Sequence, residues 1–166
     1  VAVDPSHPHA RPSELDDAVV KAALPLAMLA NAPLDLMHVF PHRRGSEGRS
    51  TTLDAKIEDL RREDADAFAK FAARYSVPPD RRSLLSGEPA EELLRHAEEK
   101  RLGLLVIGSQ YLTALDRFLL GSTAESLISQ SPCDLLLVRP TGFRDELARH
   151  QDLDALRERY AGQTVS

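Results

Sequence analysis

The sequence predicts an α/β domain in which helices cover both faces of a parallel sheet. Apolar segments of strand length alternate with longer amphipathic segments along the chain, which is typical of parallel strands joined by right-handed helical crossovers. The segment Leu104–Gly108 is short and wholly apolar, as expected for a strand that is covered on both faces. A chain of 166 residues, 42% hydrophobic and 28% charged, suits a single domain with an ordinary core.

The first strand and helix are expected within residues 1–30. Val1-Ala2-Val3 has the pattern of the end of a strand, and the numbering is therefore expected to start inside a longer chain. A polar loop, residues 4–12, follows this strand. Apolar residues at helical spacing then predict a helix as far as Ala30, with Ser13 and Asp16 as its cap. Pro25 is expected to bend this helix or to end its regular part.

The second strand–helix unit is predicted within residues 34–79. Residues 34–40 form an apolar strand, in which His38 is expected to be packed or hydrogen-bonded, and residues 41–50 form a loop. Thr51 with Asp54 is expected to cap a long amphipathic helix that ends near Tyr75, before the break at Pro78-Pro79. The acidic residues of this helix are assigned to its charged outer face; they are Glu58, Glu63, Asp64 and Asp66.

The remaining elements follow at similar spacing. Residues 82–85 read as a short strand, Gly87 turns the chain, and Pro89 suits the first turn of a helix that runs to residue 101. The strand at 104–108 is followed by a loop over 109–120 and a helix over 122–131, which Pro132 ends. A last strand is predicted from Leu135 to Val138, preceded by Cys133, which is expected to be a buried, inert thiol. The expected domain spans residues 1–140, and residues 141–166 form a tail with an amphipathic helix at 145–160.

Composition excludes several classes of partner and site. The net charge is −5, with no strongly basic stretch, which argues against nucleic acid and anionic membranes as the main partners. The longest clean apolar runs are too short to span a bilayer. A single cysteine gives neither a disulfide framework nor a cysteine-based metal site. No metal site is therefore predicted, and the cytoplasm is the expected location.

The loop between Gly108 and Thr123 carries the strongest chemical signal. Gly108 ends a strand, and Gly121, Ser122 and Thr123 open the next helix. The free N–H groups and dipole of a helix N-terminus bind anions, and glycine lets a phosphate approach the main chain closely. An alternative reading is purely structural, because Ser122-Thr-Ala-Glu125 also fits a capping box.

These residues resemble the nucleotide loop of universal stress proteins (UspA-like). The family loop has glycines at positions that correspond to 108, 111 and 121, followed by serine or threonine; Gly108, Gly121 and Ser122 match, whereas Tyr111 does not. Val1-Ala-Val-Asp4, Gly87-Glu-Pro89 and the segment from Ser131 to Pro140 resemble further family motifs in the same order. The segment Leu120-Gly-Ser-Thr-Ala-Glu125 and the acidic tail resemble the second half of tandem, UspE-type members.

The resemblance implies a five-stranded parallel sheet in the order 3-2-1-4-5 and a non-enzymatic binding and signalling role in stress survival. It implies an ATP site, with magnesium, in which Asp4 faces the ribose or the metal and the main chain near Val39 meets the adenine. Gly108, Gly121, Ser122 and Thr123 would hold the ribose and the phosphates. Tyr111, and Pro5 in place of a glycine, predict a weakened site.

Two other functions remain open, together with the mode of association. One is a domain that has lost ATP and binds another small ligand or a protein partner. The other is a nucleotide-hydrolysing or nucleotidyl-transferring enzyme, which the lack of an identifiable catalytic base disfavours. The resemblance also implies a homodimer, or pairing of tandem domains, through the apolar strand from Leu135 to Val138. The tail helix could instead cover that edge.

Overall fold

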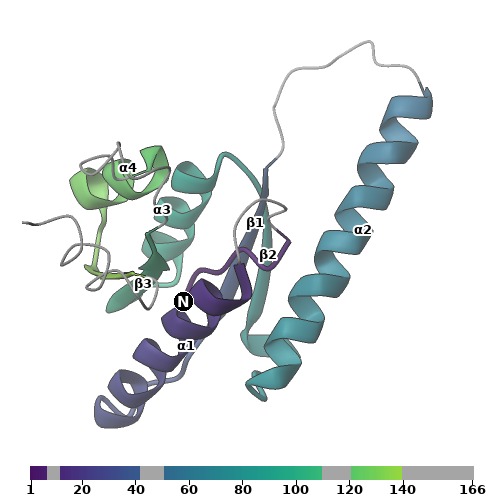
Figure 1. Cartoon of the computed structure of the whole chain (residues 1–166). Coiled ribbons are helices and arrows are strands. Elements are labelled where there is room, and N and C mark those ends of the chain that lie inside the picture. Colours follow the sequence, from purple (N-terminus) through teal and green to yellow (C-terminus); the bar gives the residue numbers. More distant parts are fainter. Residues whose placement is uncertain (7–11, 42–50, 110–120, 140–166) are drawn as a thin grey trace, which may run out of the picture.

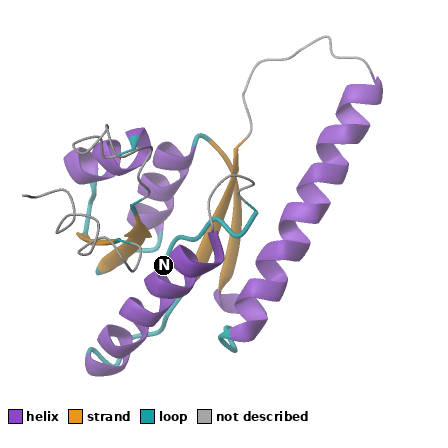
Figure 2. Ribbon diagram, in the orientation of Figure 1, coloured by secondary structure: helices purple, strands orange, loops and turns teal. Residues whose placement is uncertain are grey.

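The computed structural model describes residues 1–6, 12–41, 51–109 and 121–139 (Figure 1). Helices and strands alternate along the chain, as Figure 2 shows. The helices are α1 (Pro12–Leu29), α2 (Thr51–Arg74), the 3-10 turn η1 (Pro79–Arg81), α3 (Pro89–Glu99) and α4 (Ser122–Gln130). The strands are β1 (Leu36–Pro41), β2 (Arg82–Gly87), β3 (Leu104–Gly108) and β4 (Asp134–Val138).

The strands form two parallel pairs. β1 pairs with β2, with His38 opposite Leu84, and β3 pairs with β4, with Val106 opposite Leu136. Each pair is joined through a helix, as parallel strands require. The parallel pairing predicted from the alternation of strands and helices is confirmed for these four strands.

The backbone of residues 1–3 lies between the two strand pairs. The Ala2 N–H donates to the Val106 carbonyl at 2.9 Å, on the β3 side. On the β1 side, the Val3 N–H donates to the Met37 carbonyl at 3.0 Å, and the Met37 N–H donates to the Val1 carbonyl at 2.8 Å. The expected strand at residues 1–3 is thus a single parallel bridge, Ala2 to Met37. Its expected place beside β3 is confirmed by the bond to Val106.

Two apolar layers enclose the strands, and successive residues of a strand point alternately into one layer and the other. On the side of α1 and α2, Leu36 and Val106 pack with residues such as Val19 and Phe71. On the side of α3 and α4, Met37 and Leu105 pack with residues such as Leu127. α2 and α3 therefore lie on opposite sides of β1 and β2 (Figure 1). The predicted burial of β3 on both faces is confirmed for Leu105, Val106 and Ile107, which are all buried.

Several local predictions need correction. α1 begins at Pro12, so Ser13 lies inside the helix rather than at its N-cap position. Pro25 does not end the helix, which continues to Leu29. Pro25 and Lys21 are exposed, so water can hydrate the carbonyl that Pro25 leaves without a donor. Cys133 is only half-buried, and its thiol is free. The side chains of Thr51 and Asp54, Tyr111, and the predicted tail helix at 145–160 lie outside the described residues.

Candidate functional site

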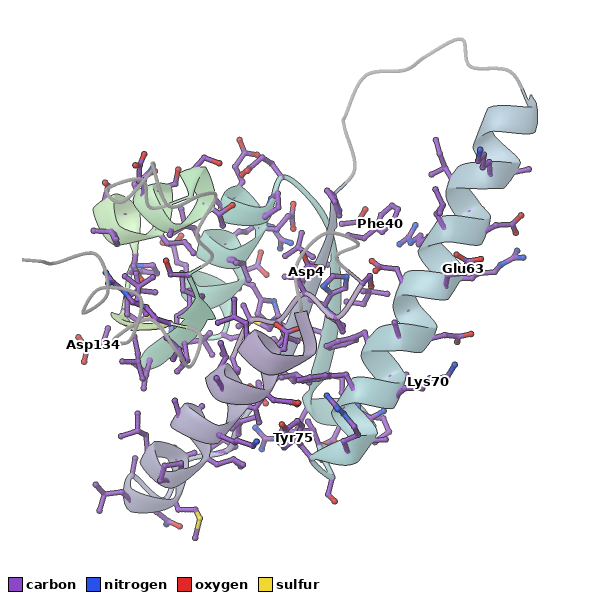
Figure 3. The ribbon with its side chains drawn as sticks, in the orientation of Figure 1. Asp4, Phe40, Glu63, Lys70, Tyr75 and Asp134 are labelled. Carbon is purple, nitrogen blue, oxygen red and sulfur yellow. The ribbon has the colours of Figure 1, made fainter. Side chains whose placement is uncertain are left out.

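Three of the predicted site residues lie at or near the carboxyl ends of the strands. Asp4 follows the central segment 1–3, Val39 lies near the end of β1, and Gly108 is the last residue of β3. Asp4 and Phe40 lie toward the same end of the strands in Figure 3. Ligands of parallel α/β sheets bind beyond this edge, where the helices that leave the strands diverge.

Asp4 presents a side chain that is 54% exposed, while its backbone is firmly held. Its N–H donates to Asp16 Oδ1 at 3.0 Å, and its carboxylate Oδ1 lies 3.9 Å from His38 Nδ1. Val39 is different, because its side chain is buried in the layer formed with α3 and α4. A ligand at this edge can therefore meet Asp4 through its side chain, but Val39 only through its main chain.

Asp16 is a buried carboxylate that the sequence assigned to helix capping. One of its oxygens accepts the Asp4 N–H, and the other, Oδ2, has no hydrogen-bond partner among the described residues. Burial raises the pKa of Asp16 to about 6. The Asp4 N–H opposes this shift, whereas the carboxylate of Asp4 adds to it. The capping prediction for Asp16 is thus wrong, because its carboxylate reaches across to the loop after residue 3.

His38 and Asp64 form a buried pair beside the same loop. His38 Nε2 lies 2.6 Å from Asp64 Oδ2, and His38 Nδ1 lies 2.9 Å from the Val3 carbonyl oxygen. The imidazole also packs on the ring of Phe68, at 5.7 Å between centroids. A carbonyl oxygen only accepts, so Nδ1 is the donor of the bond to Val3. The prediction of a hydrogen-bonded His38 is confirmed.

The assignment of Asp64 to the outer face of its helix is wrong. Asp64 is buried, whereas Glu58, Glu63 and Asp66 are exposed as predicted. A signal was present in the sequence, because Asp64 precedes Phe68 by four residues and Phe71 by seven, which places it on the apolar stripe of α2. A buried acidic side chain needs a partner, and here His38 of β1 supplies it.

Gly108 is required by packing. A Cβ built at Gly108 would lie 2.8 Å from Leu15 Cγ, and Leu15 is itself buried against the strands. The start of α1 therefore approaches the end of β3 more closely than a residue other than glycine at position 108 would allow. This close packing explains the glycine without any ligand.

Gly121 precedes the first residue of α4. It is the N-cap residue, with φ −55° and ψ 152°, and a Cβ there would meet nothing within 4 Å among the described residues. Ser122 is the first helical residue, exposed, and no side chain hydrogen-bonds to this cap within the described part of the chain. The capping-box prediction is therefore wrong, because the helix starts one residue too early for Ser122 to act as its cap. The N–H groups of the first turn, which includes Thr123, therefore have no side-chain cap among the described residues.

We expect the two glycines to respond differently to alanine. Gly108→Ala should lower the free energy of unfolding by about 1–3 kcal/mol, because the new methyl group overlaps Leu15 in a packed layer. Gly121→Ala should cost less, on the order of 1 kcal/mol or below, since only the N-cap preference is lost. Urea denaturation followed by circular dichroism measures both. Equal losses for the two variants would contradict the packing explanation for Gly108.

No group of three or more histidine, cysteine, aspartate or glutamate side chains is arranged to hold a metal ion within residues 1–6, 12–41, 51–109 and 121–139. Within the same ranges, no helix combines the length and apolar character needed to cross a membrane. The structure thus brings together an exposed carboxylate, at Asp4, and a buried acid–histidine network beside it. Among the described residues, no side chain caps the N-terminus of α4.

Comparison with known proteins gives one consistent result. A family model described as the universal stress protein family matches residues 1–139. The universal stress protein YxiE of Bacillus subtilis is 30% identical over 143 residues, covering 76% of this chain and 93% of its own. The solved PA1789 protein of Pseudomonas aeruginosa superimposes with a TM-score of 0.72 at 23% identity over 93% of this chain, which spans 50% of that longer chain. A universal stress protein solved in complex with cAMP has a TM-score of 0.51 at 25% identity, covering 85% of this chain and 94% of its own.

Proposed function

Because this chain belongs to the universal stress protein family, we propose that it is a stress-response module that binds an adenine nucleotide without turning it over. The observation that carries the proposal is the N-terminus of α4, which no side chain of the described residues caps. This helix follows β3 along the chain, and the carboxyl end of β3 lies at the same edge of the strands as Asp4 and the end of β1. A similar protein has been solved with cAMP, which supports an adenine nucleotide as the ligand class.

Each predicted residue has a role in this proposal. The main chain at Val39 meets the adenine, and Asp4 faces the ribose or a magnesium ion held by the phosphates. The N–H groups at Gly121, Ser122 and Thr123 face the phosphates, where the helix dipole favours negative charge. Gly108 keeps the main chain of β3 close to the ribose. A bound magnesium ion would neutralise phosphate charge, and holding the nucleotide in this way requires no catalytic base.

The proposal includes a single sheet of five parallel strands. Numbered along the chain with residues 1–3 as the first strand, the order is 3-2-1-4-5. The hydrogen bonds of residues 1–3 to Met37 and to Val106 support this order. Hydrogen exchange tests it, because the amides of Ala2 and Val3 should be protected to the same degree as those of β3. Rapid exchange at Ala2 and Val3 alone would argue for two separate strand pairs.

We also propose that β4 is an association edge, in a homodimer or between tandem domains. Leu135, Leu136 and Leu137 are only half-buried, and an apolar edge strand needs a cover. Light scattering of the chain should show a dimer that Leu136→Lys dissociates, provided that circular dichroism shows the variant to be folded. A chain that is monomeric before any substitution would instead favour coverage by its own tail.

Mass spectrometry of small molecules released from the purified, denatured protein tests the ligand class. Copurified ATP or another adenine nucleotide supports the proposal. A different compound would instead favour the alternative function, a family domain that has lost ATP. Tyr111 and Pro5 favour this alternative. Tyr111 replaces the middle glycine of the family's nucleotide loop, and Pro5 replaces the glycine that usually follows the acidic residue of the first strand.

Tyr111→Gly is expected to bind Mg-ATP about tenfold to a hundredfold more tightly than the unaltered chain. The gain reflects roughly one recovered charge-assisted hydrogen bond of 1.5–3 kcal/mol, made when the loop brings its main chain against the phosphates. Isothermal titration measures both affinities, and Tyr111→Ala is the control that removes the ring without adding glycine's backbone freedom. Micromolar binding by the unaltered chain, with no gain in Tyr111→Gly, would show that Tyr111 is no obstacle.

A further inference from the structure

The peptide unit between Val3 and Asp4 is held at both of its polar groups by buried side chains. Its carbonyl oxygen lies 2.9 Å from His38 Nδ1, which comes from β1. Its N–H donates to Asp16 Oδ1 at 3.0 Å, which comes from α1. Both distances are those of good hydrogen bonds. A rotation of this peptide plane would break both bonds together.

A third element, α2, fixes the orientation of the His38 side chain. Asp64 of α2 holds His38 Nε2 at 2.6 Å, so the imidazole cannot turn away from Val3 without losing a buried hydrogen bond. The side chains of Asp16, His38 and Asp64 are all more than nine-tenths buried. Helices α1 and α2 and strand β1 thus converge on the one peptide that precedes Asp4.

We infer that Asp16, His38 and Asp64 are positioning residues, which orient Asp4 toward the bound ligand by clamping the Val3–Asp4 peptide. This inference rests on the proposed function, in which Asp4 faces the ribose or the metal. The peptide plane sets the direction in which the Asp4 Cα–Cβ bond leaves the chain, and that side chain is the exposed member of the group. None of the three positioning residues needs to touch the ligand.

We call Asp16, His38 and Asp64 the clamp. The residue types in the clamp favour a positioning role over one that only stabilises the fold. An asparagine or serine at position 16 would accept the Asp4 N–H without burying a carboxylate whose Oδ2 has no partner among the described residues. Groups that lower stability in this way are concentrated at functional sites. The network also lies directly beneath the carboxylate expected to meet the ligand, 3.9 Å from it at the nearest charged atoms.

Two substitutions of His38 separate its hydrogen bond to the Val3 carbonyl from its contact with Asp64. The amide nitrogen of asparagine occupies the place of Nδ1, so His38→Asn retains a donor for the Val3 carbonyl and loses the contact with Asp64. The amide nitrogen of glutamine occupies the place of Nε2, so His38→Gln retains the contact with Asp64 and loses the bond to Val3. Asp16→Asn and Asp16→Ala form a second pair, in which only asparagine retains an acceptor for the Asp4 N–H.

The first readout needs no ligand. Amide hydrogen exchange at Asp4, measured by NMR on folded protein, should be faster in Asp16→Ala than in Asp16→Asn, and faster in His38→Gln than in His38→Asn. The difference should be about tenfold or more, since each lost bond releases the peptide locally. Equal exchange rates within each pair would overturn the clamp, whatever the ligand of the protein is.

The second readout is a double-mutant cycle on Mg-ATP affinity. His38→Gln should weaken binding by about tenfold in the unaltered background and by less than twofold when Asp4 is already alanine, because the clamp acts through Asp4. Equal losses in both backgrounds would show a general structural effect and overturn the positioning role. If the unaltered chain binds no Mg-ATP, the proposed function fails, and the exchange rates alone then decide whether the clamp exists.

Discussion

Asp64→Ala is expected to lower the free energy of unfolding by about 1–3 kcal/mol, which is the usual cost of leaving a buried polar group without its hydrogen-bond partner. The substitution leaves His38 Nε2 buried without its partner at 2.6 Å, while Nδ1 still lies 2.9 Å from the Val3 carbonyl oxygen. Urea denaturation at neutral pH, followed by circular dichroism, measures the loss. Asp64→Asn, which keeps an oxygen that can accept from Nε2, should lose distinctly less.

Glu63→Ala and Asp66→Ala are the matched controls for this substitution. Both residues lie on the same helix within two positions of Asp64, and both are exposed. Each control should change the free energy of unfolding by about 0.5 kcal/mol or less. If Asp64→Ala were as mild as its neighbours, the pair with His38 would contribute nothing to the fold, and the outer-face assignment from the sequence would have been sufficient.

Asp16→Asn is expected to stabilise the protein at pH 8, by about 1–3 kcal/mol. The pKa of Asp16 is raised by burial to about 6, above the usual value of about 4 that applies in the unfolded chain. Between these two values the folded state keeps a proton that the unfolded state has released. Stability therefore falls as pH rises through this window, and the full cost of about 3 kcal/mol is present above pH 6. Asparagine removes that cost and still accepts the Asp4 N–H, although more weakly than a carboxylate.

The pH dependence identifies the cause of this gain. The difference between Asp16→Asn and the unaltered chain should shrink as the pH is lowered from 8 to 5, because Asp16 itself becomes neutral. Denaturation curves at several pH values measure this directly. Asp17→Asn is the contrasting control: Asp17 accepts from Arg74 at 2.8 Å and from the Tyr75 hydroxyl at 2.5 Å, so its loss should destabilise. A gain for Asp16→Asn that is the same at every pH would exclude the buried charge as its source.

The amino-acid sequence alone determined the order of the elements, their parallel pairing and the family. Hydrophobic spacing is a local property, and it correctly placed the strands near β1 and β3 and the helices near α2 and α3. It also indicated that β3 is covered on both faces, because a strand without polar residues has no face suited to contact with water. The first residues of the helices were harder to predict, because several neighbouring residues suit a helix start. α1 begins at Pro12 and α4 has Gly121 as its N-cap, each one residue or more before the serine expected to cap it.

Only the tertiary structure decided how the acids near the site are used. The side chain of Asp16 bonds to a residue 12 positions away, and His38 joins Asp64 and Val3 across 26 and 35 positions. No local pattern specifies such partners, because sequence spacing gives the face of a helix on which a residue lies but not the side chain that meets it there. Asp64 was assigned to water because an isolated carboxylate in the core is unfavourable. The fold brings β1 and α2 together so that His38 meets this carboxylate, and that contact makes its burial favourable.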